Sequence, residues 1–320
     1  MHMKLYFNYM LLLLVVFTSC NSSEIEKLEL SQSSASVAQV LPEGTNWMSF
    51  IQGERKLSSL SIPGTHDAGA RYEPVSGTAK TQNLTIAEQL NAGVRFLDVR
   101  CRFVDNNFAI HHGPVYQHLN FDDVLQSCKS FLQEHPSETI IMSVKEEHTP
   151  SGNSMTFEER FIKYTDTYSG LFRLDTDIPS LQQARGKIVL LRRFGSAQAL
   201  GIQAYNGWSD NTSFTIQNQE STLQVQDAYQ VSSNTDKWNA INTLLNTSKN
   251  TDPASGTLFL NFSSGYQKKL WVIPNIPSVS NEINPKLLNY FNQQTTSHFG
   301  VIITDFIHAD LAKSIFNTNF

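Results

Sequence analysis

The first residues that could do acid–base chemistry are a histidine and an aspartate at the end of an apolar run. The run Leu60–Ile62 is stopped by Pro63-Gly64, and His66 and Asp67 follow almost at once. A strand ending here would carry an imidazole and a carboxylate at its C-terminal tip, where a β/α barrel keeps its catalytic residues. For such a pair taken alone, the alternative is a buried structural histidine beside a helix-capping aspartate.

Two further stretches place polar side chains in a similar position. In a strand-like segment after Val94, alternation puts Asp98 and Arg100 on the same face. A short apolar run then leads directly into His111 and His112. Because neighbouring strand residues point to opposite sides, we expect one of these two histidines to face a cleft.

Seven stretches, taken in order, resemble the bacterial phosphatidylinositol-specific phospholipases C. They are Ser61–Asp67, Gly93–Arg100, His111–Pro114, Glu138–Lys145, Gly186–Arg193, Val225–Tyr229 and Val301–Asp305. One such stretch is too short to identify a family. The ordered set covers most of the chain after Trp47.

The resemblance implies cleavage of phosphatidylinositol by attack of the inositol 2-hydroxyl, giving diacylglycerol and inositol 1,2-cyclic phosphate. Such a reaction needs a base, an acid for the leaving alkoxide and positive charge on the phosphoryl oxygens. The resemblance makes His66 the base, His112 the acid and Arg100 the phosphate-binding group. It implies no metal and no cofactor, since Arg100 stands where calcium-dependent eukaryotic relatives rely on a cation.

Carboxylates and pocket residues complete the site that the resemblance implies. Asp305 would orient His66, Asp67 would partner His112, and Asp98 would hold Arg100. The positions matched to substrate binding are Asp98, Lys145, Arg193, Asp227 and Tyr229. The resemblance also draws Glu146 toward the pocket. Without it, Lys145 and Arg193 would be taken for solvated surface charges and Tyr229 for ordinary packing.

Two other functions stay open at this stage. A metal-dependent glycerophosphodiester phosphodiesterase would need a carboxylate cluster, and Arg100 stands where such a site would want a ligand. A non-catalytic inositide-binding lipoprotein would also fit, although all five candidate catalytic side chains are present. Free phosphatidylinositol and glycosylated anchors are both open as substrates.

Apolar runs alternate with helical segments and predict an α/β fold, a single TIM-type barrel of parallel strands with its site at one face. Expected strands cover 57–62, 94–99, 108–110, 139–144, 187–191, 223–229, 258–262 and 301–304, and expected helices 84–92, 121–135, 157–168, 237–246 and 284–294. The family resemblance implies an irregular, incompletely closed barrel. The segment 195–221 is too weakly periodic to place, and 263–283 is expected to be a long loop.

The amino terminus has the composition of an export signal. Lys4 precedes the apolar run Tyr6–Phe17, which is shorter than the roughly 20 residues of a spanning helix. Cys20 resembles the acylated cysteine of a bacterial lipobox. We expect a lipoprotein-type signal peptide over 1–20, a flexible tether over 21–44 and a catalytic barrel domain over 45–320. The protein would be an exported, membrane-anchored lipoprotein, periplasmic or at the cell surface; simple secretion is the alternative.

Composition bounds the remaining possibilities. Forty per cent of the 320 residues are hydrophobic, enough for a sizeable core, and a net charge of -5 gives no reason to expect nucleic acid. After Cys20 only Cys101 and Cys128 remain, so the chain is not a disulfide scaffold, and their spacing matches no metal motif. We expect a monomer whose partners are an inositol phospholipid and a membrane surface, with Trp271 and Lys268 in a loop suited to lipid.

Overall fold

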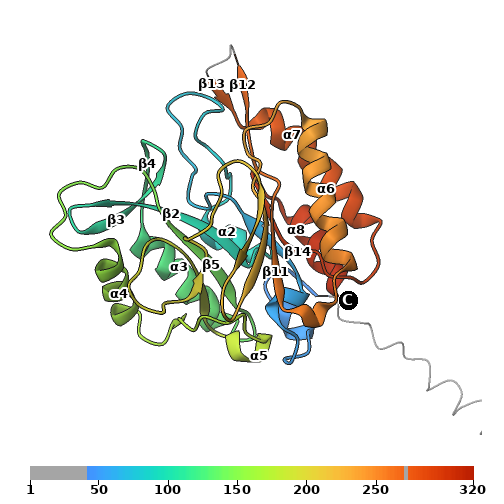
Figure 1. Cartoon of the computed structure of the whole chain (residues 1–320), viewed down its shortest axis with the longest axis horizontal. Helices are drawn as coiled ribbons and strands as arrows, with labels where there is room; N and C mark the ends of the chain where they lie inside the picture. Colours follow the sequence, from blue (N-terminus) through green and yellow to red (C-terminus); the bar gives the residue numbers. More distant parts are fainter. Residues whose placement is uncertain (1–41, 270–272) are drawn as a thin grey trace, which may run out of the picture. The chain divides into compact units, whose positions relative to one another are not determined.

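A curled sheet of mostly parallel strands lies at the centre of the structure (Figure 1). The computed structural model describes residues 42–269 and 273–320. The sheet contains β1 (Ser61–Thr65), β2 (Phe96–Val104), β5 (Ile140–Glu146), β6 (Phe172–Arg173), β7 (Ile188–Arg193), β8 (Ile202–Gln203), β9 (Ser213–Gln217), β10 (Thr222–Gln226), β11 (Thr257–Phe262) and β14 (Gly300–Thr304). Their order is β6-β7-β5-β2-β1-β14-β11-β10-β9, with β8 paired to β7.

The barrel is not closed by backbone pairing. Within the described residues no strand ladder joins β9 to β6 or β8. Side chains bridge the gap instead: the amide of Gln203 donates to Asn218 Oδ1 at 2.9 Å, and the amide of Asn218 donates back to the Gln203 carbonyl at 2.8 Å. The α/β fold class and the incompletely closed barrel are therefore confirmed.

Two parts of the sheet are antiparallel, which corrects the expectation of parallel strands throughout. β3 (Asn107–His112) and β4 (Val115–Asn120) form a hairpin that extends β2, and β9 runs antiparallel to β10. Asp105 and Asn106 join β2 to β3 with φ angles of 48° and 59°. Two left-handed residues are what a two-residue hairpin turn requires, and aspartate and asparagine tolerate that conformation.

Helices cover the outer face of the sheet. They are α2 (Ile86–Asn91), α3 (Phe121–Glu134), α4 (Phe157–Thr167), α6 (Asn234–Asn250), α7 (Pro277–Asn292) and α8 (Ala309–Phe316). The short helix α5 (Leu181–Ala184) lies instead at the lower end of the sheet in Figure 1, and its buried residues join the core inside the barrel. In Figure 1, α6 lies alongside β11, while α3 and α4 lie on the other side of the molecule. α3 shows why the prediction succeeds there: apolar residues recur on one face, Asn120 and Asp123 form a capping box, and Pro136 follows its end.

The apolar residues of each strand alternate between two cores. Leu97, Met142 and Ile302 belong to the core under the helices, whereas Phe96, Ile141 and Val301 belong to a second core inside the barrel. Strand side chains point alternately to the two faces, so continuous apolar runs fill both cores. These two cores hold the strand ends in fixed positions.

A buried ion pair closes the end of the barrel opposite the site. Arg95 donates to Glu138 at 2.8 Å, both side chains are fully buried, and Arg95 also donates to the carbonyl of Gly44 at 2.8 Å. Trp47 stacks on Phe316, and both belong to the core inside the barrel. The chain is therefore tied to the barrel from Gly44 onward, the last residue of the predicted tether.

Several predicted element boundaries were wrong. The segment 263–283 is not one loop, since it contains β12 (Gln267–Lys269), β13 (Ile273–Asn275) and the start of α7. That helix begins seven residues before the predicted start because Pro277 occupies its first turn, a favoured position. The first expected strand starts later, after a 3-10 turn at Leu57–Ser59. The unplaced segment 195–221 supplies the short strands β8 and β9.

Some predictions fall outside the described residues. These are the signal peptide with Cys20, the tether up to residue 41, and Trp271 in the expected lipid-facing loop. Residues 42–320 form a single compact unit by themselves. In the described part of the chain, no helix has both the length and the apolar character that crossing a membrane requires.

Candidate active site

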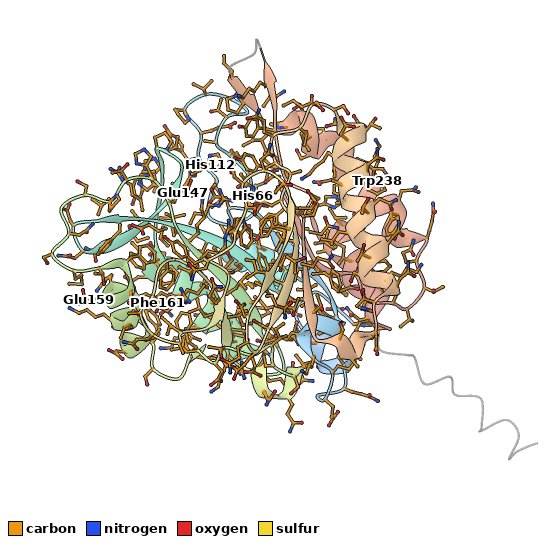
Figure 2. The ribbon with its side chains drawn as sticks, viewed as in Figure 1. His66, His112, Glu147, Glu159, Phe161 and Trp238 are labelled. Carbon is orange, nitrogen blue, oxygen red and sulfur yellow. The ribbon has the colours of Figure 1, made fainter. Side chains whose placement is uncertain are left out.

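A cavity of about 360 Å³ opens where the parallel strands end. Of the ten residues predicted for the site, all but Asp67 and Asp98 line this cavity. Figure 2 shows His66, His112 and Glu147 together at this end of the sheet. The polar side chains that follow separate strands therefore lie together at one face of the barrel, as predicted.

His66 is held by a carboxylate from the neighbouring strand. β1 and β14 are parallel neighbours, so the residues that follow them meet, and His66 Nδ1 lies 2.8 Å from Asp305 Oδ1. The other Asp305 oxygen accepts from the Gly265 N–H at 3.2 Å. Gln82, which the sequence analysis did not identify, donates to the carbonyls of His66 and Thr304 at 3.0 and 2.8 Å. The imidazole is therefore fixed with Nε2 left for other contacts.

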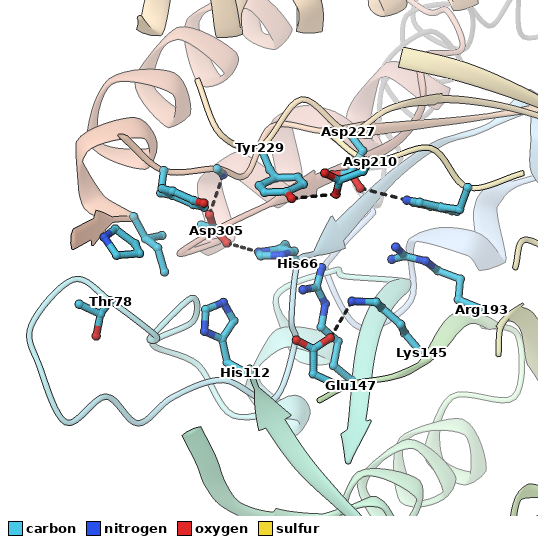
Figure 3. Close-up of a pocket in the computed structure, with 16 residues that line it drawn as sticks. His66, Thr78, His112, Lys145, Glu147, Arg193, Asp210, Asp227, Tyr229 and Asp305 are labelled. Atoms are coloured by element: carbon cyan, nitrogen blue, oxygen red, sulfur yellow. Dashed lines mark hydrogen bonds and ion pairs between the residues drawn. The ribbon is translucent and has the colours of Figure 1, made fainter. Parts of the chain in front are cut away.

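His112 faces His66 across the cavity (Figure 3). Their ring centroids are 6.5 Å apart, and the rings are nearly perpendicular. Burial and the positive charge of Arg100 lower the pKa of His112 to about 3. His111 does not line the cavity and is 5% exposed. Only one of the two adjacent histidines faces the cavity, as strand alternation predicted.

Asp98 connects the cations of the site. It is fully buried; one oxygen lies 3.0 Å from Arg100 Nε, and the other accepts from Ser143 at 3.1 Å and from Arg193 at 3.4 Å. Burial alone would raise its pKa, but Arg100 and Arg193 hold the pKa of Asp98 well below its usual value. Asp98 was placed among the substrate-binding residues; in the structure it reaches the cavity only through the arginines.

Asp67 does not form the contact that the resemblance implied. Within the described residues neither carboxylate oxygen of Asp67 has a hydrogen-bond partner, so the expected bond to His112 is absent. β1 ends at Thr65 and Asp67 takes a φ of 38° in the following turn, so strand alternation no longer determines where its side chain points. Burial raises the pKa of this carboxyl well above its usual value.

The wall beyond Arg100 carries paired charges. Lys145 donates to Glu147 at 2.7 Å, and Glu147 also accepts from the N–H of Gly113 at 3.1 Å, next to His112. Burial opposes ionisation of Glu147, but Arg100 and Lys145 lower its pKa to about 2. Glu147 lines the cavity and Glu146 does not. Strand alternation places 145 and 147 on one side, and that signal was available in the sequence.

Trp208 and Asp210, which were not predicted, also line the cavity. The Arg193 guanidinium lies 3.6 Å from the Trp208 ring centre, and the indole N–H donates to Asp227 at 3.2 Å. Asp210 accepts from the Tyr229 hydroxyl at 2.8 Å; burial and this carboxylate raise the pKa of Tyr229 to about 12. Both residues come from the unplaced polar segment, which had no periodicity to identify them.

The structure also locates the remaining candidate ligands. Cys101 and Cys128 are buried free thiols. Across residues 42–269 and 273–320, no group of three or more His, Cys, Asp or Glu side chains is arranged to hold a metal ion.

Comparisons with known proteins agree with this geometry. The family model for the phosphatidylinositol-specific phospholipase C X domain matches residues 57–194. The 1-phosphatidylinositol phosphodiesterase of Staphylococcus aureus strain Newman is 32% identical over 299 residues, covering 86% of this chain and 94% of the relative. The chain belongs to the phosphatidylinositol-specific phospholipase C family. A 1-phosphatidylinositol phosphodiesterase of Listeria monocytogenes is 29% identical over 284 residues, with coverage of 85% and 84%.

Solved phospholipase C structures show the same fold. A Staphylococcus aureus phosphatidylinositol-specific phospholipase C superimposes with a TM-score of 0.79 at 30% identity, covering 87% of this chain and 98% of that one. The Listeria monocytogenes enzyme gives 0.69 at 27% identity, covering 87% and 100%. The recognition made from seven short stretches is confirmed.

The lowered pKa of His112 leads to a testable prediction. Without substrate, this imidazole should be neutral and should not titrate between pH 5 and 8, because a pKa near 3 leaves no proton to lose in that range. Histidine ring resonances followed by NMR across this range, with His112→Asn used to assign the signal, check this. A His112 midpoint near 6.5 would show that burial and Arg100 do not control its charge.

Proposed function

We propose that this protein cleaves phosphatidylinositol by attack of the inositol 2-hydroxyl on the phosphorus, giving diacylglycerol and inositol 1,2-cyclic phosphate. The observation that carries the proposal is the pair of facing imidazoles, His66 held by Asp305 and His112 beside Arg100. Internal attack needs a base on one side of the phosphorus and an acid on the other. Family membership supports the same reaction.

His66 is the proposed base. Its Nδ1 contacts Asp305, so Nε2 is the nitrogen that takes the proton of the 2-hydroxyl. Asp305 keeps the ring in that tautomer and stabilises the imidazolium as it forms. Arg100 then meets the negative charge that develops on the phosphoryl oxygens.

His112 is the proposed acid, and it must gain a proton before it can act. The bound phosphodiester anion should raise the pKa of His112, because its negative charge offsets the Arg100 charge that lowers this pKa. Asp67 stays the proposed partner of His112, although burial raises its pKa and the two side chains share no hydrogen bond in the free protein. With substrate bound, His112 takes up a proton from solvent and passes it to the diacylglycerol oxygen as the bond from that oxygen to phosphorus breaks.

The charged end of the cavity is the proposed inositol site. Lys145, Arg193 and Asp227 offer donors and acceptors for ring hydroxyls, and Tyr229 offers an aromatic face for the flat side of the ring. Glu147, Trp208 and Asp210 join this set because they fix those side chains. Free phosphatidylinositol and glycosylated anchors share the inositol phosphate that this site would bind.

The family match and the site together weigh against the two alternatives. A glycerophosphodiester phosphodiesterase would place acidic metal ligands where Arg100 lies against Asp98. A non-catalytic inositide-binding protein would need no second histidine facing the first. Cleavage is the function that uses every charged group in the cavity.

The substrate is a membrane lipid, so the cavity mouth is proposed to meet a membrane. Tyr72 and Ile273 are 45% and 41% exposed and offer apolar surface that could contact lipid. They belong to the same two segments that supply Thr78 and Pro274 to the cavity wall. A solved Staphylococcus aureus relative is described in terms of its membrane binding.

The two histidines can be assigned separately by changing the leaving group. His112→Ala should lose about 10²–10⁴ in kcat on phosphatidylinositol, because the glyceride alkoxide is a poor leaving group without a proton. On p-nitrophenyl inositol phosphate, whose leaving group departs unprotonated, His112→Ala should recover most of this loss. His66→Ala should stay impaired on both substrates because the 2-hydroxyl still lacks its base.

Rescue of His66→Ala instead of His112→Ala would exchange the two assignments. A wild-type protein that releases no cyclic phosphate from phosphatidylinositol vesicles would refute the proposed function itself. Each assay should be run with and without EDTA. A loss of activity in EDTA would reveal a metal requirement.

We also propose that Cys20 is acylated and tethers the exported enzyme to a bacterial membrane, periplasmic or at the surface. The apolar run and the small residues before Cys20 support this. Labelled palmitate should enter the wild-type protein and not Cys20→Ala, and the variant should appear in the medium or periplasmic fluid. Equal unlabelled release of both proteins would favour simple secretion.

A further inference from the structure

The cavity has a second end that carries no charge. In Figure 3, Thr78 lies on the far side of His66 and His112 from Arg193. Pro274 and Ile276 belong to the same cavity wall. We call Thr78, Pro274 and Ile276 the apolar annex. None of these residue types ionises, in contrast to the paired charges around Arg100.

The annex is preformed by contacts between two distant segments. The Ile276 N–H donates to the carbonyl of Gly77 at 2.9 Å, which ties the start of α7 to the loop that carries Thr78. A Cβ on Gly77 would lie only 3.0 Å from Asn275 Oδ1, and its φ of 83° also favours glycine. The two walls therefore approach closely at this position.

Glu73 holds the loop of the annex in shape. One carboxylate oxygen accepts from the N–H groups of Gly77, Thr78 and Lys80 at 2.9, 3.1 and 3.2 Å. Although partial burial opposes ionisation, these bonds lower the pKa of Glu73 below its usual value. The loop keeps this geometry at neutral pH, so the annex does not depend on substrate to form it.

We propose that the apolar annex binds the glycerol ester part of the leaving group. The proposal rests on the proposed function, in which inositol takes the charged end and the phosphorus lies between the two histidines. The diacylglycerol oxygen departs from the side of the phosphorus opposite the 2-hydroxyl, so the glyceride extends away from the inositol site. Its ester groups and methylenes are uncharged, and the annex offers them one hydroxyl and two apolar side chains.

Two reactions at the same site distinguish binding of the glyceride from a general loss of folding or catalysis. Cleavage of monomeric dihexanoyl phosphatidylinositol needs inositol, phosphate and glyceride sites. Opening of its product, inositol 1,2-cyclic phosphate, by water would use the same two histidines with acid and base roles exchanged, and it needs only the inositol and phosphate sites. Thr78→Trp should fill the annex and lower kcat/KM on the lipid by about 10- to 100-fold, the range for a misfitted apolar group. Hydrolysis of the cyclic phosphate should stay within about twofold of wild type.

Two further variants complete the experiment. Ser76→Trp adds the same ring at an exposed position on the same loop and should change neither reaction, because Ser76 does not line the cavity. Ile276→Ala should enlarge the annex and raise KM for the lipid alone, which keeps the test open if Thr78→Trp fails to fold. Equal losses of kcat/KM in both reactions, or no loss in either, would contradict the proposal that the apolar annex binds the glyceride. A wild-type protein inactive on both substrates would instead overturn the proposed function, and the annex with it.

Discussion

The active site depends on one buried carboxylate. Asp98 lies fully inside the barrel and balances Arg100 and Arg193, two guanidinium groups that would repel each other without it. Breaking such a buried pair from one side leaves an uncompensated charge, which is strongly unfavourable. Ser143 and the N–H of Asp67 donate to the same carboxylate, so its position is set from several strands.

The order of strands makes this arrangement possible. β2, β5 and β7 are adjacent and parallel, with Asp98 opposite Ser143 and Lys145 opposite Arg193. Arg100 therefore reaches the cavity with its guanidinium already oriented, and its charge lowers the pKa of both Glu147 and His112. The same charges thus support the proposed phosphate binding by Arg100 and keep His112 unprotonated in the free protein. Preorganised charge of this kind needs no reorientation during the reaction.

The sequence identified the site best where strand geometry determines side-chain position. His66 and Asp305 follow neighbouring strands, and alternation separates His112 from His111. Neglect of the same alternation gave Glu146 in place of Glu147.

Trp208 and Asp210 were missed because β8 and β9 are short and polar, so only tertiary contacts position these residues. The Asp67 side chain was misplaced because it lies in a left-handed turn, where strand alternation no longer applies. Within the fold, β4 was missed because a tight turn after β3 continues the sheet with a second antiparallel strand instead of the expected helix.

We infer that Asp98 acts on catalysis by holding Arg100 in place. A double-mutant cycle of Asp98→Asn and Arg100→Lys, measured as kcat/KM for monomeric phosphatidylinositol on variants shown to be folded, tests it most directly. Asp98→Asn alone is expected to lower kcat/KM by about 10²-fold or more, the loss typical of removing a positioned charge stabiliser. In the Arg100→Lys background the same change should cost less than about tenfold, because the group it positions is gone. An equal loss of kcat/KM in both backgrounds would show that Asp98 does not act through Arg100.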